Sequence, residues 1–150
     1  ALYNAELEAL GEEKAIPVIA DDSGLIVDAL PGQLGVRTAR YGSPDGVTIL
    51  PAHQKNQLLL KAMENIPFEK RGAKFVCSVT CILTPYKMYS VQEECLGHIL
   101  FEETGTEGFG YDPVFFCKEA NSPMGLLPNY SKNNYSHRSK AVASLLKLIK

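Results

Sequence analysis

The chain has 150 residues, a length that suits one domain with a sizeable hydrophobic core. Hydrophobic residues make up 45% of the sequence and charged residues 21%, proportions that are typical of a globular protein. The formal net charge of −2 gives no general positive field that would attract nucleic acid. No apolar run is long enough to predict a membrane span.

The first half of the sequence predicts two helices and two strands. The elements in chain order are a helix over 5–15, strands over 16–20 and 25–30, a Gly- and Pro-rich loop over 31–51 and a helix over 52–66. The apolar residues expected to pack are Leu7, Leu10 and Ala15 in the first helix and Leu58, Leu59, Ala62 and Met63 in the second.

The second half predicts a long antiparallel hairpin and a terminal helix. The elements in chain order are strands over 73–83 and 88–101, a glycine-rich loop running into an aromatic strand over 102–116, an irregular segment over 121–135 and a helix over 137–150. Ser136 is the expected N-cap of this helix. Its expected packing face consists of Val142, Leu145, Leu146 and Ile149. Because no repeat or linker divides the chain, we expect one α/β domain over residues 1–150.

The four cysteines predict neither a disulfide nor a zinc site. Cys77, Cys81, Cys95 and Cys117 show no C-x-x-C spacing, and no histidine lies at a zinc-ligand spacing from them. Cys77 and Cys81 lie four residues apart on one predicted strand, which is too far for a disulfide at roughly 3.3 Å per residue. We therefore expect buried free thiols in a reducing cytosol, and a cytoplasmic protein.

Two adjacent carboxylates, Asp21 and Asp22, lie between the first two predicted strands. Carboxylates are rarely buried unless they are paired or bind a metal, and the following Ser23-Gly24 allows a sharp turn or a close approach to a ligand. Two interpretations remain open on these residues alone. Either an aspartate accepts backbone hydrogen bonds in a turn, or the pair belongs to a metal or acid–base site.

The stretch GTEGFGYDP, residues 105–113, combines three glycines with two aromatic side chains. Glycines would let backbone N–H groups meet a ligand, and Phe109 or Tyr111 could stack on a planar ring. It is neither a P-loop nor a dinucleotide fingerprint, because no Lys-Ser/Thr pair closes it and a strand is predicted to follow. In isolation the stretch is more typical of a structural loop than of a ligand site.

His137 and Arg138 lie in the first turn of the terminal helix, where cations oppose the helix dipole. A nearby acceptor would explain them, and both a ligand and a carboxylate such as Asp112 are candidates. Lys132 could join the same cluster. Arg37 and Arg40 in the long loop suit phosphate or carboxylate contacts. Together with the aspartates and the glycine–aromatic loop, these residues suggest a metal-assisted site for a nucleotide.

The chain resembles the inosine triphosphate pyrophosphatase family. The resemblance depends on ADDSGLIVDAL at residues 20–30, GFGYDPVFF at 108–116 and a lysine followed by SHR at 132–138, in the family's order. It implies an elongated α/β fold with a mixed sheet, a homodimer, and Mg²⁺-dependent hydrolysis of ITP, dITP and XTP to nucleoside monophosphate and pyrophosphate.

The resemblance also assigns roles to individual residues. It makes Asp22 the metal ligand and proton acceptor for the attacking water. The residues that it implies for substrate binding are Ser23, Phe109, Gly110, Tyr111, Asp112, Lys132, His137 and Arg138.

Some family features are missing from this sequence. The family's N-terminal strand and phosphate-binding motif are absent, and Leu126 stands at a usual Glu position. We therefore expect an N-terminally incomplete domain. The alternative function is an inactive or incomplete homologue that binds nucleotide without turnover.

Overall fold

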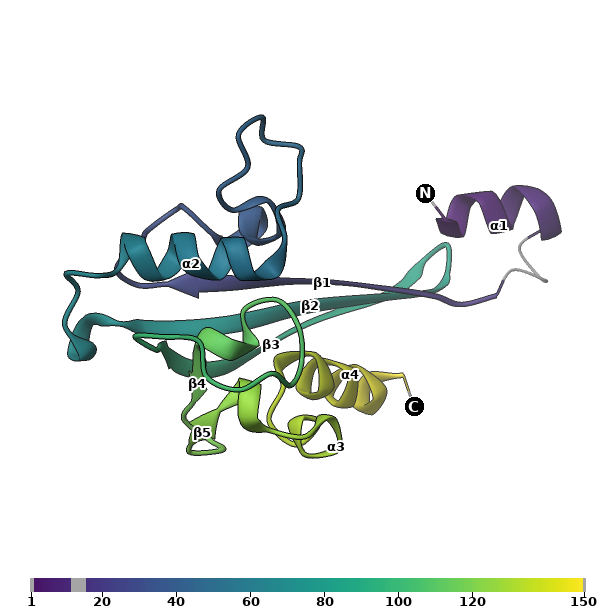
Figure 1. Cartoon of the computed structure of the whole chain (residues 1–150). Helices are drawn as coiled ribbons and strands as arrows, with labels where there is room; N and C mark the ends of the chain where they lie inside the picture. Colours follow the sequence, from purple (N-terminus) through teal and green to yellow (C-terminus); the bar gives the residue numbers. More distant parts are fainter. Residues whose placement is uncertain (1, 12–15, 150) are drawn as a thin grey trace.

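A computed structural model describes residues 2–11 and 16–149 (Figure 1). The strands are β1 (Val18–Val27), β2 (Gly72–Thr84), β3 (Lys87–Ile99), β4 (Phe115–Cys117) and β5 (Ser122–Pro123). The α-helices are α1 (Leu2–Leu10), α2 (Ala52–Ala62), α3 (Asn129–Lys132) and α4 (His137–Leu148). The short 3₁₀ helices are η1 (Gly35–Arg40), η2 (Phe68–Lys70), η3 (Asp112–Val114) and η4 (Met124–Leu126).

The five strands form one sheet in the order β1-β2-β3-β4-β5. The sheet is elongated, with α2 and α4 on opposite sides of its long strands and α1 beyond one end of β1 (Figure 1). The expected α/β fold with a long hairpin is confirmed, because β2 and β3 pair along their length around the turn after Thr84. Every pairing among the described residues is antiparallel, so the parallel pairing of a mixed sheet is not found in this part of the chain.

The prediction of two short strands around the aspartate pair is wrong. β1 is one continuous strand from Val18 to Val27, and its ladder to β2 runs without interruption through Asp21 and Asp22. Gly24 is needed for close packing and makes no turn, since an added Cβ would lie 2.5 Å from the carbonyl oxygen of Gly35 in η1. Backbone pairing with β2 satisfies the polar groups that a turn would otherwise have to satisfy.

The core forms two clusters on the sheet. The larger one joins β1, β2 and α2 to the aromatic segment around β4, and includes Leu25, Leu59, Met63, Phe75 and Phe115. The smaller one lies under α4 and consists of Cys77, Val79, Cys81, Ala141 and Leu145. Buried residues alternate along β2, with Phe75, Cys77, Val79 and Cys81 on the face that enters the core.

Helix periodicity correctly predicted some of the buried residues of α2 and α4, but the predicted faces also included residues that are exposed. In α2, Leu59 and Met63 are buried as expected, whereas Leu58 and Ala62 are exposed. In α4, Leu145 is buried and Ile149 packs beside it, whereas Val142 and Leu146 are exposed. Ala141 takes their place because a small residue lets the helix lie close to the sheet.

The buried residue of α1 is Tyr3, while the predicted contact residue Leu10 is 45% exposed. Leu7 is partly buried, and Ala15 lies outside the described residues. Within the described part of the chain, no helix is both long enough and apolar enough to cross a membrane.

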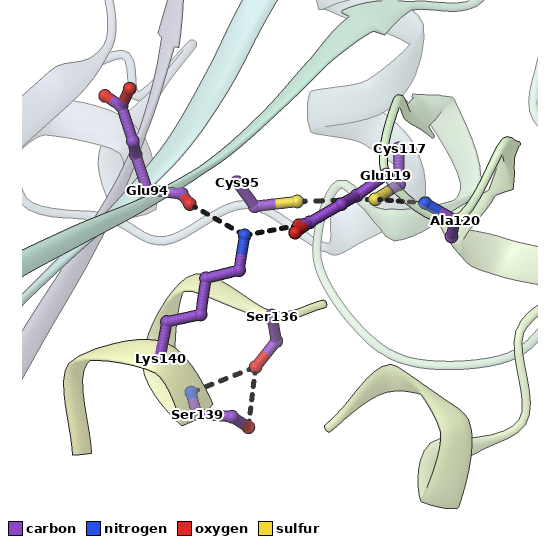
Figure 2. Close-up of polar contacts among 8 residues, drawn as sticks. All are labelled: Glu94, Cys95, Cys117, Glu119, Ala120, Ser136, Ser139 and Lys140. Carbon is purple, nitrogen blue, oxygen red and sulfur yellow. Dashed lines mark hydrogen bonds and ion pairs between the residues drawn. The ribbon is translucent and has the colours of Figure 1, made fainter. Parts of the chain in front are cut away.

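The four cysteines are free and buried, as predicted. Cys95 and Cys117 lie with their sulfur atoms 3.5 Å apart on neighbouring strands, close to Lys140 of α4 (Figure 2). Their hydrogen bond lowers the pKa of Cys117 to about 6 and, together with burial, raises the pKa of Cys95. Lys140 donates to the carbonyl of Glu94 and pairs with Glu119, and these contacts anchor α4 to the β3–β4 end of the sheet.

Candidate active site

A pocket of about 500 Å³ opens where the glycine-rich loop, α3 and the start of α4 meet. Five residues singled out in the sequence line it together: Phe109, Asp112, Lys132, His137 and Arg138. The segment predicted as irregular supplies its floor, because it folds into η4 and α3. Lys132, the last residue of α3, thereby reaches the same space as the N-terminus of α4.

Lys132 and Asp112 form a buried ion pair with a distance of 3.0 Å between Nζ and Oδ2. Asp112 also accepts a hydrogen bond from the backbone N–H of Phe109 at 3.2 Å, so one carboxylate positions a cation and an aromatic residue. Gly108 has a φ of +86°, and an added Cβ would lie 2.0 Å from both Asp112 Oδ2 and Lys132 Nζ. Glycine is therefore required there by conformation and by space.

His137 is a largely buried, neutral imidazole at the start of α4. Its ring stacks on Phe75, with centroids 5.0 Å apart and planes inclined by 11°. Burial and the neighbouring charge of Arg138 lower the pKa of His137 to about 4. Its Nδ1 atom is buried and has no hydrogen-bond partner among the described residues. The preceding Ser136 caps the helix as predicted, accepting from the Ser139 N–H at 3.1 Å.

Arg138 pairs with Asp21, not with Asp112. Its Nε donates to Asp21 Oδ2 at 2.6 Å, joining α4 to β1. A ligand or a carboxylate such as Asp112 was predicted beside this cation. Asp112 instead forms an ion pair with Lys132. The carboxylate of Asp21 supplies the negative charge that a helix N-terminus favours.

Asp22 and Ser23 lie apart from this pocket. They line a smaller pocket of about 230 Å³ with Ser78 of β2 and Gln92 of β3. Asp22 follows Asp21 on the strand, so the two carboxylates point to opposite faces of the sheet. Asp22 is exposed, and its Oδ1 accepts the Ser23 N–H at 2.9 Å. The Ser23 hydroxyl is buried and has no hydrogen-bond partner in the described residues.

Two of the predicted substrate-binding residues, Tyr111 and Gly110, do not line the 500 Å³ pocket. They hold the glycine-rich loop in place through contacts with η1 and α2. Tyr111 is buried, and its hydroxyl donates to the carbonyl of Thr38 at 2.9 Å, which joins the loop to η1. Burial raises its pKa. The carbonyl of Gly110 accepts from Asn56 of α2 at 3.2 Å, beside a separate pocket of about 330 Å³.

A hydrogen-bond network that holds the glycine-rich loop against α2 was not predicted from the sequence. Glu103 accepts hydrogen bonds from Asn56 at 2.7 Å and Gln57 at 3.1 Å, and it lies 2.6 Å from His53 Nδ1. Burial alone would raise the pKa of Glu103, but these contacts lower it. The signal was present as polar residues along one face of the predicted helix, whose partner lies about fifty residues away in the chain.

Arg37 and Arg40, predicted to suit anions, line a different and larger pocket of about 1170 Å³. Lys61 and Glu64 also line this pocket. The pocket is not formed by the residues around His137, so the structure does not bring the two arginines to that site.

Comparison with known proteins identifies the family. The profile of the Ham1 family matches residues 1–148. The dITP/XTP pyrophosphatase of Treponema denticola is 42% identical over 136 residues, which cover 89% of this chain and 68% of that protein. The enzyme of the same name from Geobacter sulfurreducens is 42% identical over 130 residues, covering 87% and 63%.

Solved structures agree with the sequence comparison. The Ham1 protein of Staphylococcus aureus has a TM-score of 0.81 at 31% identity, with 98% of this chain and 71% of that chain covered. The chain thus spans about two thirds of the length of the curated relatives that it matches. The resemblance inferred from the three motifs is confirmed, and the chain belongs to the Ham1 family.

Proposed function

We propose that this protein hydrolyses deaminated purine nucleoside triphosphates, namely ITP, dITP and XTP, to nucleoside monophosphate and pyrophosphate. The observation that carries the proposal is the 500 Å³ pocket in which Lys132, His137 and Arg138 converge beside Phe109. Relatives at about 40% identity bear the name dITP/XTP pyrophosphatase, which agrees with this assignment.

The polar lining of the pocket suits the 6-oxo edge of a deaminated purine. Lysine and arginine side chains only donate hydrogen bonds, so they match a carbonyl oxygen. The 6-amino group of adenine would instead face these donors with hydrogens of its own and leave them unpaired. Phe109, which is 71% exposed, offers a ring face on which the base can stack.

The proposal gives Asp22 the role of metal ligand and proton acceptor for the attacking water. The described residues contain no group of three or more His, Cys, Asp or Glu side chains that could hold a metal. One exposed carboxylate nevertheless fits Mg²⁺, which takes one or two carboxylates and completes its shell with substrate phosphates and water. When bound, Mg²⁺ would neutralise phosphate charge and polarise the scissile phosphorus centre. Ser23, beside Asp22, would contact the substrate.

We also propose that this chain forms a homodimer, as the resemblance implies. The four unpaired cysteines suit a reducing compartment, which agrees with a cytoplasmic location.

The decisive experiment is pyrophosphate release from ITP and XTP by this chain, with GTP and ATP as controls, in Mg²⁺ and in EDTA. Release confined to ITP and XTP and dependent on the metal would support the proposal. Binding of ITP without release would favour the alternative of an incomplete homologue. Equal release from all four nucleotides would refute the role of the pocket in base recognition.

A further inference from the structure

We propose that Asp21 is a positioning residue that aims the Arg138 guanidinium into the pocket and thereby sets selectivity for the base. The inference rests on the proposed function, since it deepens the recognition part of the same site. It gives the two adjacent aspartates of β1 separate tasks. Asp22 acts at the phosphates and Asp21 acts, through Arg138, at the base.

The contact between the two side chains has a geometry suited to positioning. Asp21 Oδ2 accepts the Nε–H of Arg138 at 2.6 Å and a longer hydrogen bond from the Cys77 thiol at 4.0 Å. Within residues 2–11 and 16–149, the two terminal nitrogens of Arg138 make no hydrogen bond. The Arg138 side chain lines the pocket. A guanidinium held at Nε keeps its terminal N–H groups free to meet an acceptor in a fixed direction.

Arg138 has no hydrogen bond or ion pair other than the one to Asp21 in the part of the chain that the structure describes. Its side chain is 46% exposed and stands at the second residue of α4, where the helix dipole disfavours a cation. Asp21, in contrast, is fixed by the β1–β2 ladder, in which it is paired with Val79. A rigid strand therefore holds a flexible cation at the mouth of the pocket.

The same arrangement occurs on the other side of the pocket. Lys132 is held by Asp112, which comes from a different segment of the chain. His137, which lines the same pocket, is neutral and stacks on Phe75. Each of the two cations thus receives its direction from a carboxylate outside its own helix.

A purely structural role for the Asp21–Arg138 pair is the competing explanation. The apolar contacts of Ala141 and Leu145 with β2 already anchor α4 to the sheet. The helix also has a second ion pair, between Lys140 and Glu119, which lies outside the pocket (Figure 2). Lys140→Ala is therefore a matched control, because it removes a cation–carboxylate contact of the same helix without touching the pocket.

The test is isothermal titration calorimetry on the full chain with two non-hydrolysable ligands in Mg²⁺. One is the α,β-imido analogue of ITP, and the other is the same analogue of purine riboside triphosphate, which lacks the 6-oxygen. The proteins are the wild type, Asp21→Ala, Arg138→Ala, the double variant and Lys140→Ala. Circular dichroism spectra establish that each variant is folded.

We expect Asp21→Ala to weaken the ITP analogue about 5-fold, a size typical of a partly exposed ion pair, and to leave the analogue without the 6-oxygen within about 2-fold. In the Arg138→Ala background, Asp21→Ala should cause no further loss. Lys140→Ala should change neither affinity.

Equal losses for both ligands, or a full loss from Asp21→Ala when Arg138 is already absent, would overturn the inference. A wild type that binds both analogues equally would instead refute base reading itself, and with it the proposed function. The two failures are therefore distinguishable in one set of titrations.

Discussion

His137 should make the stability of the protein fall as the pH drops below neutrality. Its pKa is about 4 in the folded chain and 6.5 in the unfolded reference, because burial and Arg138 disfavour the imidazolium. Between these values the unfolded state binds more protons than the folded state. The stability that comes from keeping His137 neutral is therefore fully present above pH 6.5. It is lost progressively as the pH falls toward 4.

The size of the effect follows from the pKa difference. At about 1.4 kcal/mol per unit, the shift corresponds to roughly 3 kcal/mol of unfolding free energy. The ring keeps some contact with solvent, and screening reduces the expected loss to about 2 kcal/mol. That amount is a large fraction of the stability of an ordinary domain, roughly 5–15 kcal/mol.

The assay is urea unfolding at pH 7.5, 6.0 and 4.5, followed by far-UV circular dichroism. His137→Gln removes the titration, so the wild type should lose about 2 kcal/mol more than this variant between pH 7.5 and 4.5. If wild type and His137→Gln lose stability in parallel, the imidazole is not kept neutral by burial and the reasoning is wrong.

Three further predictions concern the loop, the sheet and the proposed catalytic carboxylate. Asp112→Ala leaves Lys132 buried and unpaired, so the free energy of unfolding should fall by about 3 kcal/mol. The fall caused by Asp112→Ala should be smaller when Lys132→Met is also present. Additive effects in the double variant would contradict this coupling. Gly97→Ala should cost about 2 kcal/mol in urea unfolding, because its Cβ would lie 2.1 Å from the backbone oxygen of Phe116; an unchanged midpoint would show that β3 and β4 can separate. Asp22→Asn should abolish pyrophosphate release from ITP and leave the circular dichroism spectrum unchanged, and normal turnover would remove Asp22 from catalysis.

Local sequence patterns predicted the parts of the fold that depend on near neighbours. The strand pattern over 73–83 correctly predicted β2, and Ser136 was correctly identified as the N-cap of α4. Both features depend on side chains within a few residues of each other, so they are visible in the sequence. Phe109 was likewise singled out by its place in a glycine-rich loop, and it lines the pocket together with Asp112.

A buried arginine shows what local patterns could not indicate. Arg71 is 1% exposed, and its guanidinium donates to the carbonyls of Met63, Ile99 and Leu100 at 2.6–2.8 Å. Burial lowers its pKa, but these acceptors compensate for lost water. In the sequence it is an ordinary charged residue before a strand, because the carbonyls that make its burial possible come from the ends of α2 and β3.

Local patterns were sufficient to predict the strand hairpin, the terminal helix and the set of residues that mark the family. Pairing with β2 makes β1 continuous through the aspartate pair and points its two carboxylates to opposite faces of the sheet. The packing of distant segments also sets which carboxylate meets which cation. Asp21 and Arg138 are 117 positions apart, and their pairing depends on the docking of α4 against the sheet. Contacts of that range are set by packing, and no pattern within either segment specifies them.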